Sequence, residues 1–423
     1  MNLVAEKPAQ VEAFEALEKS ARGAAPSWLS GLRRKAIARF SEEGFPVKSP
    51  ASWKFTDPAP LAAMALPGEA APALSQEQVR GLMLASLSGP RLVFVGGRFA
   101  PALSSVPEGA MVCDLASGLG RAEPLLGTLG GDGGAFRDLN TAFFRDGALI
   151  DLPRGAALKD PVHLVFIAAP GMSCPRVLIR LDAGAGACVV EEYVSAGDAA
   201  GLTNAVSEVF LGEGARLEHI RLQREGEGAF HVSSLDVRQG RGSVFTGHAV
   251  TLGGAVTRNE VHVRLEAEGA ECALNGLYLA DGRQQVDNQT VVEHAKPHGT
   301  SRGLYKGVLD GQARAVFNGL VHVLKDAQKT DANVYNKNLL LSEQGLVDSN
   351  PEFKINANDV QCRHGATIGQ LSSDALFYLR SRGIGAREAK QLLVYAFASE
   401  MVDRIGPPPL KDALSGWLQG RLS

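Results

Sequence analysis

Short runs of alternating hydrophobic and polar residues fill the chain from about residue 155 onward, and they recur at a nearly constant interval. Each run follows a glycine and a small residue. The repeated glycines are Gly186, Gly214, Gly242 and Gly269. The steps between them are 28, 28 and 27 residues, and the pair Gly299-Thr300 follows after 30 more. A second strand-like run lies between successive glycines, so each repeat supplies two short strands.

A repeat of this length, with alternating strands and glycine corners, is typical of a solenoid. One turn cannot bury its apolar face alone, but stacked turns share a continuous core. The sequence therefore predicts a mainly β protein with a right-handed parallel β-helix over residues 155–369. A β-sandwich has similar turn spacing, but it gives no reason for a near-constant step of 28 residues.

Helical patterns flank this core on both sides. Apolar residues at helical spacing, beginning with Val11 and Phe14, predict helices in an N-terminal region of residues 1–154. The same region contains a predicted β-hairpin over 91–99, where two apolar runs meet at a Gly-Gly turn. A C-terminal helical domain is expected over 370–423.

Two helices are predicted in the C-terminal domain, over 374–382 and 386–405. The second ends before a run of prolines, which cannot continue a helix. Its apolar stripe includes Leu392, Leu393, Met401 and Ile405. The stripe is plain core packing if the helix lies inside the core. If the β-helix leaves this helix outside, we expect the stripe to dock a partner protein.

One pair of residues near the end of the predicted β-helix points to chemistry. Cys362 and His364 are two positions apart on a predicted strand, so their side chains share a face. Thiol and imidazole are ligands for iron and for other soft or borderline metals. Two ligands do not close a metal site, so we expect a partner surface to complete it. The alternatives are a histidine bonded to backbone near a turn and a cysteine that packs as a small hydrophobe.

Composition narrows the function classes. The chain has 423 residues, 45% hydrophobic, with a net charge of −3 and no basic patch interleaved with aromatics, which argues against nucleic acid. No apolar run reaches membrane-spanning length and no signal peptide stands at the N-terminus, so a cytoplasmic location is expected. The five cysteines form no Cys-x-x-Cys pair, and no Gly-Lys-Ser/Thr phosphate cradle is present. We therefore expect neither a self-contained cluster site nor ATP hydrolysis.

Several longer motifs carry a family resemblance. The motifs are Arg91–Arg98, Leu252–Arg258, Gly311–Leu320, Lys329–Asn333, Cys362–Gly369 and Phe377–Ile384. With them the chain resembles the SufB/SufD family of iron–sulfur cluster assembly proteins, and its SufD members most. We know of no other family with the last four motifs in this order. Before Trp53 the resemblance is weak.

The resemblance implies a β-helix core between helical ends, a SufB-like paralogue paired edge to edge, and a SufC-type ATPase docked on the C-terminal helices. It implies a non-enzymatic scaffold that binds iron or a nascent cluster only transiently, at the interface with the paralogue. In SufD members the histidine of the Cys-x-His motif is associated with iron or cluster assembly, and it maps onto His364. No stably bound cofactor is implied, and no flavin role follows from the sequence.

Two alternatives remain at the level of sequence. A SufB-like chain would accept sulfur on a cysteine and act as a homodimer, but the matching stretch carries Asn336-Lys-Asn338 and no thiol. That departure favours SufD, although a homodimer in the absence of SufB stays open. A β-helix enzyme acting on polysaccharide would need aromatic sugar platforms, and aromatic residues make up only 6% of this chain.

Overall fold

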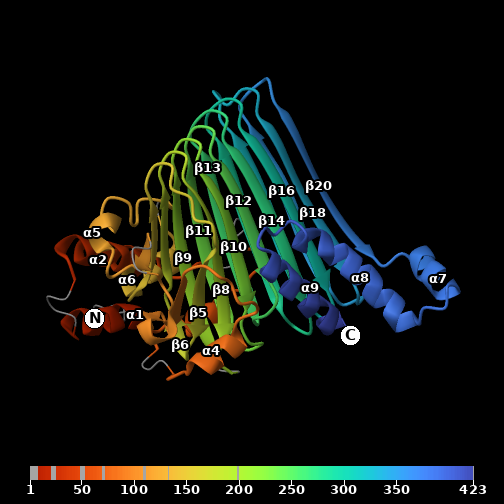
Figure 1. Cartoon of the computed structure of the whole chain (residues 1–423), viewed down its shortest axis with the longest axis horizontal. Coiled ribbons are helices and arrows are strands. Elements are labelled where there is room, and N and C mark those ends of the chain that lie inside the picture. Colours follow the sequence, from red (N-terminus) through yellow and green to blue (C-terminus); the bar gives the residue numbers. More distant parts are fainter. Residues whose placement is uncertain are drawn as a thin grey trace, which may run out of the picture.

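The computed structural model describes residues 8–20, 25–47, 53–68, 72–107, 111–131, 133–197 and 200–422. Residues 1–7 and 48–52, which fall in the predicted N-terminal region, lie outside the described residues. Two long sheets face each other along the length of the molecule, and helices lie at both ends of the chain (Figure 1). This confirms the predicted mainly β solenoid with helical termini.

From β7 onward the strands alternate between the two sheets along the chain, so each coil there contributes one strand to each. The first sheet has the order β2 (Arg98–Phe99), β1 (Arg91–Val95), β5 (Val162–Ala168), β8 (Gly186–Ser195), β10 (Arg216–Arg224), β12 (Val244–Thr251), β14 (Glu271–Ala280), β16 (Thr300–Leu309), β18 (Asp331–Leu340), β20 (Gln361–Gln370). The second has the order β19 (Leu346–Ile355), β17 (Arg314–Val323), β15 (Gln285–His294), β13 (Val256–Leu265), β11 (Phe230–Gln239), β9 (Gly201–Leu211), β7 (Arg176–Leu181), β4 (Gly147–Leu152), β3 (Val112–Asp114), with β6 (Gly171–Ser173) beside β9.

Pairing is parallel from coil to coil, as a solenoid requires. The predicted hairpin is present: β1 pairs with β2 in antiparallel register at Phe94 and Phe99. However, β1 also pairs in parallel with β5, and β4 pairs in parallel with β7. Strands before residue 155 thus already belong to the two sheets. The division of the chain into domains of residues 1–154, 155–369 and 370–423 stays a prediction.

Corner residues with a left-handed backbone stack along one edge of the solenoid. Gly214, Gly242 and Gly269 have φ values of 64°, 58° and 69°, and each donates its N–H to a carbonyl of the following coil. Glycine adopts this conformation without a steric penalty, which explains the repeat. The next two coils place His298 and Lys329 at the same position, with φ of 60° and 61°.

The first corner glycine of the repeat is Gly184, which lies one Gly-Ala pair before the Gly186 expected from the sequence. Gly184 has a φ of 70° and donates its N–H to the Glu213 carbonyl, as the other corner glycines do to their neighbours. Gly186 is instead the first residue of β8. Two Gly-Ala pairs follow each other here, and the sequence pattern cannot tell which one turns the corner.

The helices cover particular faces. Their bounds are α1 (Ala9–Ser20), α2 (Ser27–Glu43), α3 (Ala59–Ala63), α4 (Gln76–Leu82), α5 (Leu119–Ala122), α6 (Ala135–Phe143), α7 (Ser373–Ser381), α8 (Ala386–Val402) and α9 (Pro408–Leu422), with a 3-10 turn η1 (Pro101–Leu103). Helices α2 and α6 pack with the first coils in one apolar cluster, while α8 and α9 pack on the outer face of the first sheet. Figure 1 shows α7 projecting away from the sheets.

Candidate functional site

The two ends of the solenoid differ in what covers them. At the N-terminal end, β2 and β3 pair in antiparallel fashion with the first strands, and Phe94 and Val112 there are buried in the core. At the C-terminal end, β19 and β20 are the last strands of their sheets. Their inward-facing residues Ile355 and Ile368 remain 41% and 50% exposed, because no described coil follows. We call β19 and β20 the terminal coil.

Cys362 and His364 lie on the terminal coil and face the solenoid interior. In the ladder, Cys362 is the register partner of Ala332 and His364 that of Val334. Both partners are buried in the core, and side chains at paired positions of parallel strands stack in line. Cys362 is half-buried against the core, whereas His364 is exposed at the open end. The two side chains therefore share one face, as the strand spacing predicted.

The surroundings of the pair affect its chemistry. The His364 ring stacks on Phe353 of β19, with ring centroids 4.7 Å apart and planes inclined by 7°. Burial raises the pKa of the Cys362 thiol, which keeps it protonated near neutral pH. Among the described residues, no group of three or more His, Cys, Asp or Glu side chains is placed to hold a metal ion. The roles of Cys362 and His364 in metal binding stay a prediction.

A buried polar network lies directly behind the terminal coil. The Tyr278 hydroxyl donates to Asn338 Oδ1 at 2.5 Å and accepts from Asn336 Nδ2 at 3.0 Å. Asn338 Nδ2 donates to Asn336 Oδ1 at 2.6 Å, and the Ser349 hydroxyl donates to the same oxygen at 2.8 Å. The sequence showed that no thiol stands here, but it did not reveal this network. The spacing of Asn336 and Asn338 on one strand face was the available signal.

The C-terminal helices require a correction to the predicted docking stripe. Met401 and Ile405 are 3% and 1% exposed, because they pack on outward-facing residues of the first sheet. They belong to the contact that holds α8 on the solenoid and cannot dock a partner. Leu392 is 44% exposed and Leu393 is half-buried, so a docking role for these two stays a prediction.

Helix α7 offers the largest exposed aromatic side chains of the described chain. Phe377 is 75% exposed and Tyr378 is 58% exposed. No residue of α7 is buried, and Ser372 caps its first turn by accepting from the Ala375 N–H. These aromatics belong to the family motif Phe377–Ile384, and the sequence pattern does not reveal that their side chains are exposed.

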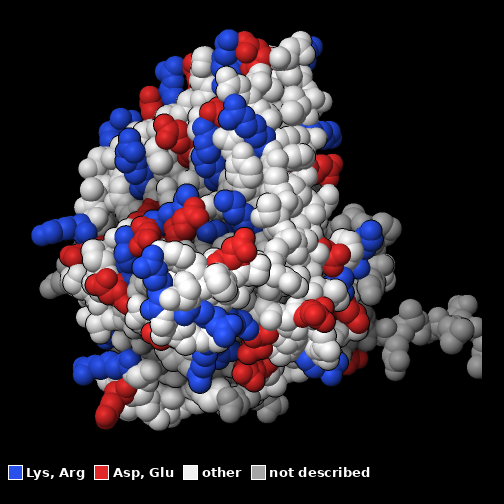
Figure 2. Space-filling view, turned by 90° about the vertical axis from the view of Figure 1, so that its right-hand side faces the viewer, with Lys and Arg blue, Asp and Glu red and all other residues white. Residues whose placement is uncertain are grey.

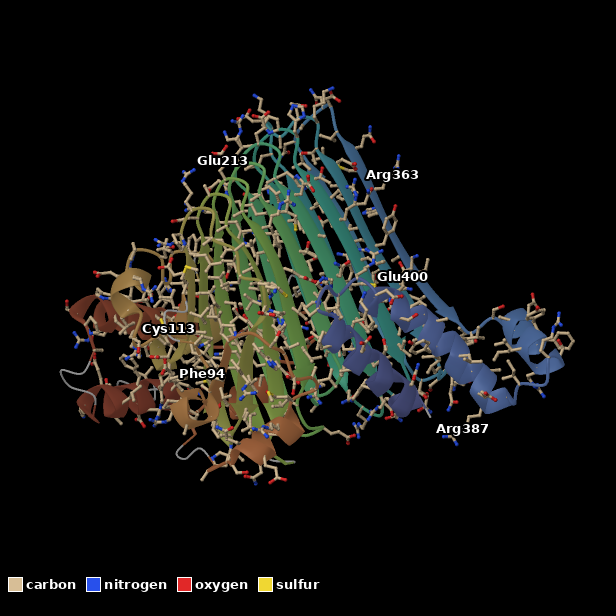
Figure 3. The ribbon with its side chains drawn as sticks, viewed as in Figure 1. Phe94, Cys113, Glu213, Arg363, Arg387 and Glu400 are labelled. Atoms are coloured by element: carbon tan, nitrogen blue, oxygen red, sulfur yellow. The ribbon has the colours of Figure 1, made fainter. Side chains whose placement is uncertain are left out.

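A polar contact fixes the position of α8. Lys306 of β16 donates through Nζ to the Phe397 carbonyl and to Glu400 Oε2, both at 2.7 Å. The hydrogen bond from Lys306 contributes most to lowering the pKa of Glu400. Figure 3 shows Glu400 at the end of α8 that lies against the strands, and Arg387 at the opposite end. This contact adds to the apolar packing of Val394 and Met401, which also holds α8 on the first sheet.

Buried charges also occur inside the solenoid, away from the terminal coil. Glu191 accepts hydrogen bonds from Tyr193 and Ser207, at 2.7 and 2.8 Å, and lies 2.9 Å from His219 Nε2. Burial alone would raise the pKa of Glu191, but His219 and these hydrogen bonds hold it at about 2. This group is enclosed by the coils, so it belongs to the core and not to the candidate site.

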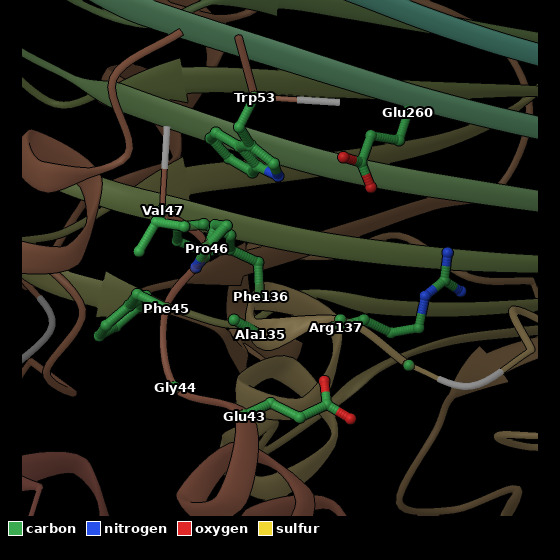
Figure 4. A pocket seen from close by; sticks show the side chains of 12 residues that line it. Glu43, Gly44, Phe45, Pro46, Val47, Trp53, Ala135, Phe136, Arg137 and Glu260 are labelled. Carbon is green, nitrogen blue, oxygen red and sulfur yellow. The ribbon is translucent and has the colours of Figure 1, made fainter. Parts of the chain in front are cut away.

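A cavity of about 420 Å³ lies between the N-terminal helices and the second sheet, with Trp53, Phe136, Arg137 and Glu260 in its wall (Figure 4). Trp53 is 8% exposed and stacks on Phe136, while the Arg258 guanidinium lies 4.0 Å from the centre of its ring. The tryptophan is thus a packing anchor between the helices and the solenoid.

Positive and negative side chains are mixed on the end of the molecule that carries the terminal coil. Figure 2 faces this end and shows Lys and Arg interspersed with Asp and Glu. Several of these charges pair locally, as Arg302 does with Asp331 and Lys329 with Asp359. In the described residues, no helix is long and apolar enough to span a membrane.

Comparison with known proteins identifies the family. Residues 165–397 match the SufBD core domain of the SUF system for FeS cluster assembly. An iron–sulfur cluster assembly SufBD family protein of Synechocystis is 34% identical over 430 residues, covering 97% of this chain and 93% of the relative. The iron–sulfur cluster assembly protein SufD of Escherichia coli is 32% identical over 395 residues, covering 90% of each chain. A SufBD family protein of Mycobacterium tuberculosis is 29% identical over 317 residues, covering 71% of this chain and 78% of that one. The solenoid, the Cys-x-His strand and these matches together place the chain in the SufBD family of iron–sulfur cluster assembly proteins, among its SufD-like members.

Proposed function

We propose that this chain is a non-enzymatic scaffold subunit of a SufBCD-type complex that works in the cytoplasm. In this proposal a SufB-like paralogue joins the terminal coil, and a SufC-type ATPase docks on the C-terminal helices. The nascent cluster is a cargo that forms between the chains. We assign no stable cofactor, and no flavin, to this chain.

One observation carries the proposal: the terminal coil is left open. Its core-facing residues Ile355 and Ile368 are exposed, although the same columns of side chains are buried one coil earlier. Exposed apolar residues at the end of a continuous core are typical of a surface that a partner covers. His364 and Cys362 lie on this surface, so a ligand set completed by a partner would form where the two chains meet.

The geometry of His364 suits a shared ligand. Its contact with Phe353 occupies one face of the imidazole ring, and both ring nitrogens lie on the ring edge. An imidazole nitrogen is a good ligand for iron. The stack restrains the rotation of the ring, so that a nitrogen is held toward the interface before iron arrives.

Cys362 is suited to a secondary role. Its thiol is half-buried, and burial raises its pKa, so it carries no charge until a metal displaces the proton. A thiol of this kind binds a cluster once iron is close, but it is a poor nucleophile for attack on a sulfur donor. Cys362 therefore supports the site, and the paralogue supplies the sulfur-accepting cysteine.

The docking of the ATPase is assigned to α7 and the exposed face of α8. Phe377 and Tyr378 on α7 and Leu392 on α8 present apolar surface that no described element covers. Because Lys306 holds α8 on the first sheet, a force applied to these helices reaches β16, two strands from the edge. ATP hydrolysis by the partner would use this connection to move the interface.

The test is the complex carrying His364→Ala, purified after co-expression with the paralogue and the ATPase. We expect normal assembly on size exclusion and a sharp fall in cluster content, read by visible absorption. His262→Ala is the matched control, because His262 is 45% exposed on the outer face of β13, away from the terminal coil. Cys362→Ala should reduce the cluster content less. Normal cluster content in the His364→Ala complex would show that the site lies on the paralogue alone.

A SufB-like sulfur acceptor is the second candidate, and the structure argues against it. The stretch that would carry the cysteine contains Asn336 and Asn338, which are buried and committed to hydrogen bonds with Tyr278. Without a paralogue, the same terminal coil is free to join a second copy of this chain. Light scattering of the isolated protein distinguishes the monomer from that homodimer.

A further inference from the structure

A pocket of about 320 Å³ opens on the outer face of the first sheet, beside the end of α8. Strands β14, β16 and β18 form its floor, and Arg404, which follows α8, stands on one side. None of the described residues that line it belongs to β19 or β20, so the pocket is separate from the terminal coil. Its volume is at the lower end of the range of small-molecule sites.

Three cations and no carboxylate line this pocket. The cations are Arg302, Lys337 and Arg404. Arg302 donates through Nη1 to the Asp331 carbonyl at 2.8 Å and pairs through Nη2 with the Asp331 carboxylate. Arg404 donates through Nη2 to Glu400 Oε1 at 3.3 Å. These bonds hold both guanidinium groups in place, and each group keeps further N–H donors for a ligand.

The charges at the pocket do not balance. Lys337 Nζ makes no hydrogen bond or ion pair with any residue that the structure describes. Arg404 shares the Glu400 carboxylate with Lys306. The three lining cations and Lys306 therefore face only two carboxylates, and two positive charges remain. A phosphate monoester fits this surplus, because it carries about −1.5 to −2 charge at pH 7, whereas one carboxylate carries −1.

A flat apolar wall lies beside these cations. Tyr335 is 36% exposed, and its hydroxyl bonds to no group of the described chain. Its ring lies over Gly365 of β20, where a Cβ atom would come within 3.2 Å of the ring. Leu304 is half-buried and continues this wall toward the helices. An aromatic ring gains from stacking on such a surface, so the wall favours a ligand with a planar organic body over a bare inorganic ion.

Two carboxamides line the same pocket. Asn275 is 6% exposed, and its Oδ1 accepts from Arg404 Nη1 at 3.3 Å. Asn333 Oδ1 is buried and accepts no hydrogen bond from the residues that the structure describes. A buried acceptor without a donor is costly, so each such group in a native protein calls for an explanation. A ligand with an N–H or O–H group would supply the missing donor.

We propose that this pocket binds a small phosphate monoester with a planar organic body. Lys337 and the two arginines hold the phosphate, the body lies on Tyr335, and Asn333 Oδ1 accepts a hydrogen bond from it. The site does not rest on the proposed scaffold function, since no partner chain contributes to it. The bound ligand connects Arg404 at the end of α8 with β18, and so strengthens the attachment of the C-terminal helices to the solenoid.

Isothermal titration of the full-length isolated chain with phenyl phosphate tests the proposal. We expect saturable binding that is about threefold to tenfold tighter than that of inorganic phosphate, because only phenyl phosphate stacks on Tyr335. Benzoate has the ring but a single negative charge, and it should bind about tenfold more weakly than phenyl phosphate. The proposal is overturned if phenyl phosphate does not saturate, or if either of the other two probes binds as tightly.

Point variants assign the binding to this pocket. Lys337→Ala and Arg404→Gln should each weaken phenyl phosphate about tenfold. Tyr335→Ala should bind phenyl phosphate and inorganic phosphate equally. Lys325→Ala is the matched control, because this exposed lysine lies in the turn between β17 and β18 and does not line the pocket.

The melting temperature without ligand shows whether each variant is folded. Lys337 is exposed and unpaired in the described chain, so Lys337→Ala stays folded and carries the test if Arg404→Gln does not. Wild-type affinity for phenyl phosphate in Lys337→Ala, or an equal loss in Lys325→Ala, would place the binding elsewhere and overturn the proposal.

Discussion

The ring of His364 on β20 lies flat against Phe353 on β19, with centroids 4.7 Å apart. This contact bridges the two sheets at the open end of the solenoid. Phe353→Leu keeps an apolar side chain but removes the stacking, which is worth about 0.5–1.5 kcal/mol in aromatic pairs. We expect a small loss of stability and a clear loss of cluster content in the complex, because the imidazole is no longer held in place. Phe317→Leu, one coil inward, is the control: its ring packs on Tyr305 and not on His364, so the change should lower stability without a specific loss of cluster.

Met401 and Leu392 lie on the same helix but should respond differently to truncation. Met401→Ala empties a buried position against the first sheet, and we expect a loss of about 2–5 kcal/mol in the free energy of unfolding. Leu392 is exposed, so Leu392→Ala should change stability by less than about 0.5 kcal/mol. Urea denaturation measures both. In a pull-down with the ATPase, Leu392→Ala should bind less; unchanged binding would move the docking surface to α7 alone.

Deletion of everything after Gly369 should yield an insoluble protein. Helices α8 and α9 cover outward-facing apolar residues of the first sheet, among them Ile220, Leu222 and Val250. Removing the helices exposes this surface, and exposed apolar patches promote aggregation. The fraction of soluble protein after expression measures the effect. The paired variant Phe377→Ser/Tyr378→Ser should stay soluble, because neither side chain is buried, and it is the better test of ATPase docking.

Tyr278→Phe tests the network behind the terminal coil. The hydroxyl links Asn338 and Asn336, and its removal takes away the hydrogen bond that the buried Asn338 Oδ1 accepts, while Asn336 Nδ2 keeps its bond to the Tyr305 carbonyl. Such a loss costs about 1–3 kcal/mol of stability. The same change at Tyr305, a buried neighbour that joins the network through its backbone carbonyl and not through its hydroxyl, should cost less. Equal losses in the two variants, measured by urea denaturation, would mean that the hydroxyl of Tyr278 contributes nothing specific.

His294 gives the stability a dependence on pH. Its Nε2 lies 2.9 Å from the Ser301 hydroxyl, and burial lowers its pKa from 6.5 to about 4. Between these values the unfolded chain binds a proton that the folded chain does not, so the free energy of unfolding falls as the pH drops through that window. The shift corresponds to roughly 3 kcal/mol.

Urea denaturation at pH 7 and pH 4 measures this contribution in the wild type and in His294→Gln. The variant has no titrating ring, so its stability should fall less between the two pH values, by about the same roughly 3 kcal/mol. Contributions of the carboxylates cancel in the comparison. A variant His294→Gln with the wild-type pH dependence would exclude this assignment.

The sequence by itself determined the solenoid, because the repeat is a local property. Each corner needs a residue that accepts a positive φ, and glycines such as Gly214 and Gly242 mark those corners in the chain. Alternation of side chains likewise placed Cys362 and His364 on one face, since strand geometry requires nothing beyond the neighbouring residues.

Only the tertiary structure decided what those faces meet. An apolar stripe like that of α8 has the same sequence pattern in a helix that packs on its own core and in one that docks a partner. The packing of α8 on the first sheet buries Met401 and leaves Leu392 exposed to solvent. Likewise, the sequence contains Pro351 but cannot tell which side of β19 lacks its donor. That side depends on the hydrogen-bond register with β17, a contact between residues more than thirty positions apart. Non-local pairing of this kind is set by the stacking of coils, which no local pattern encodes.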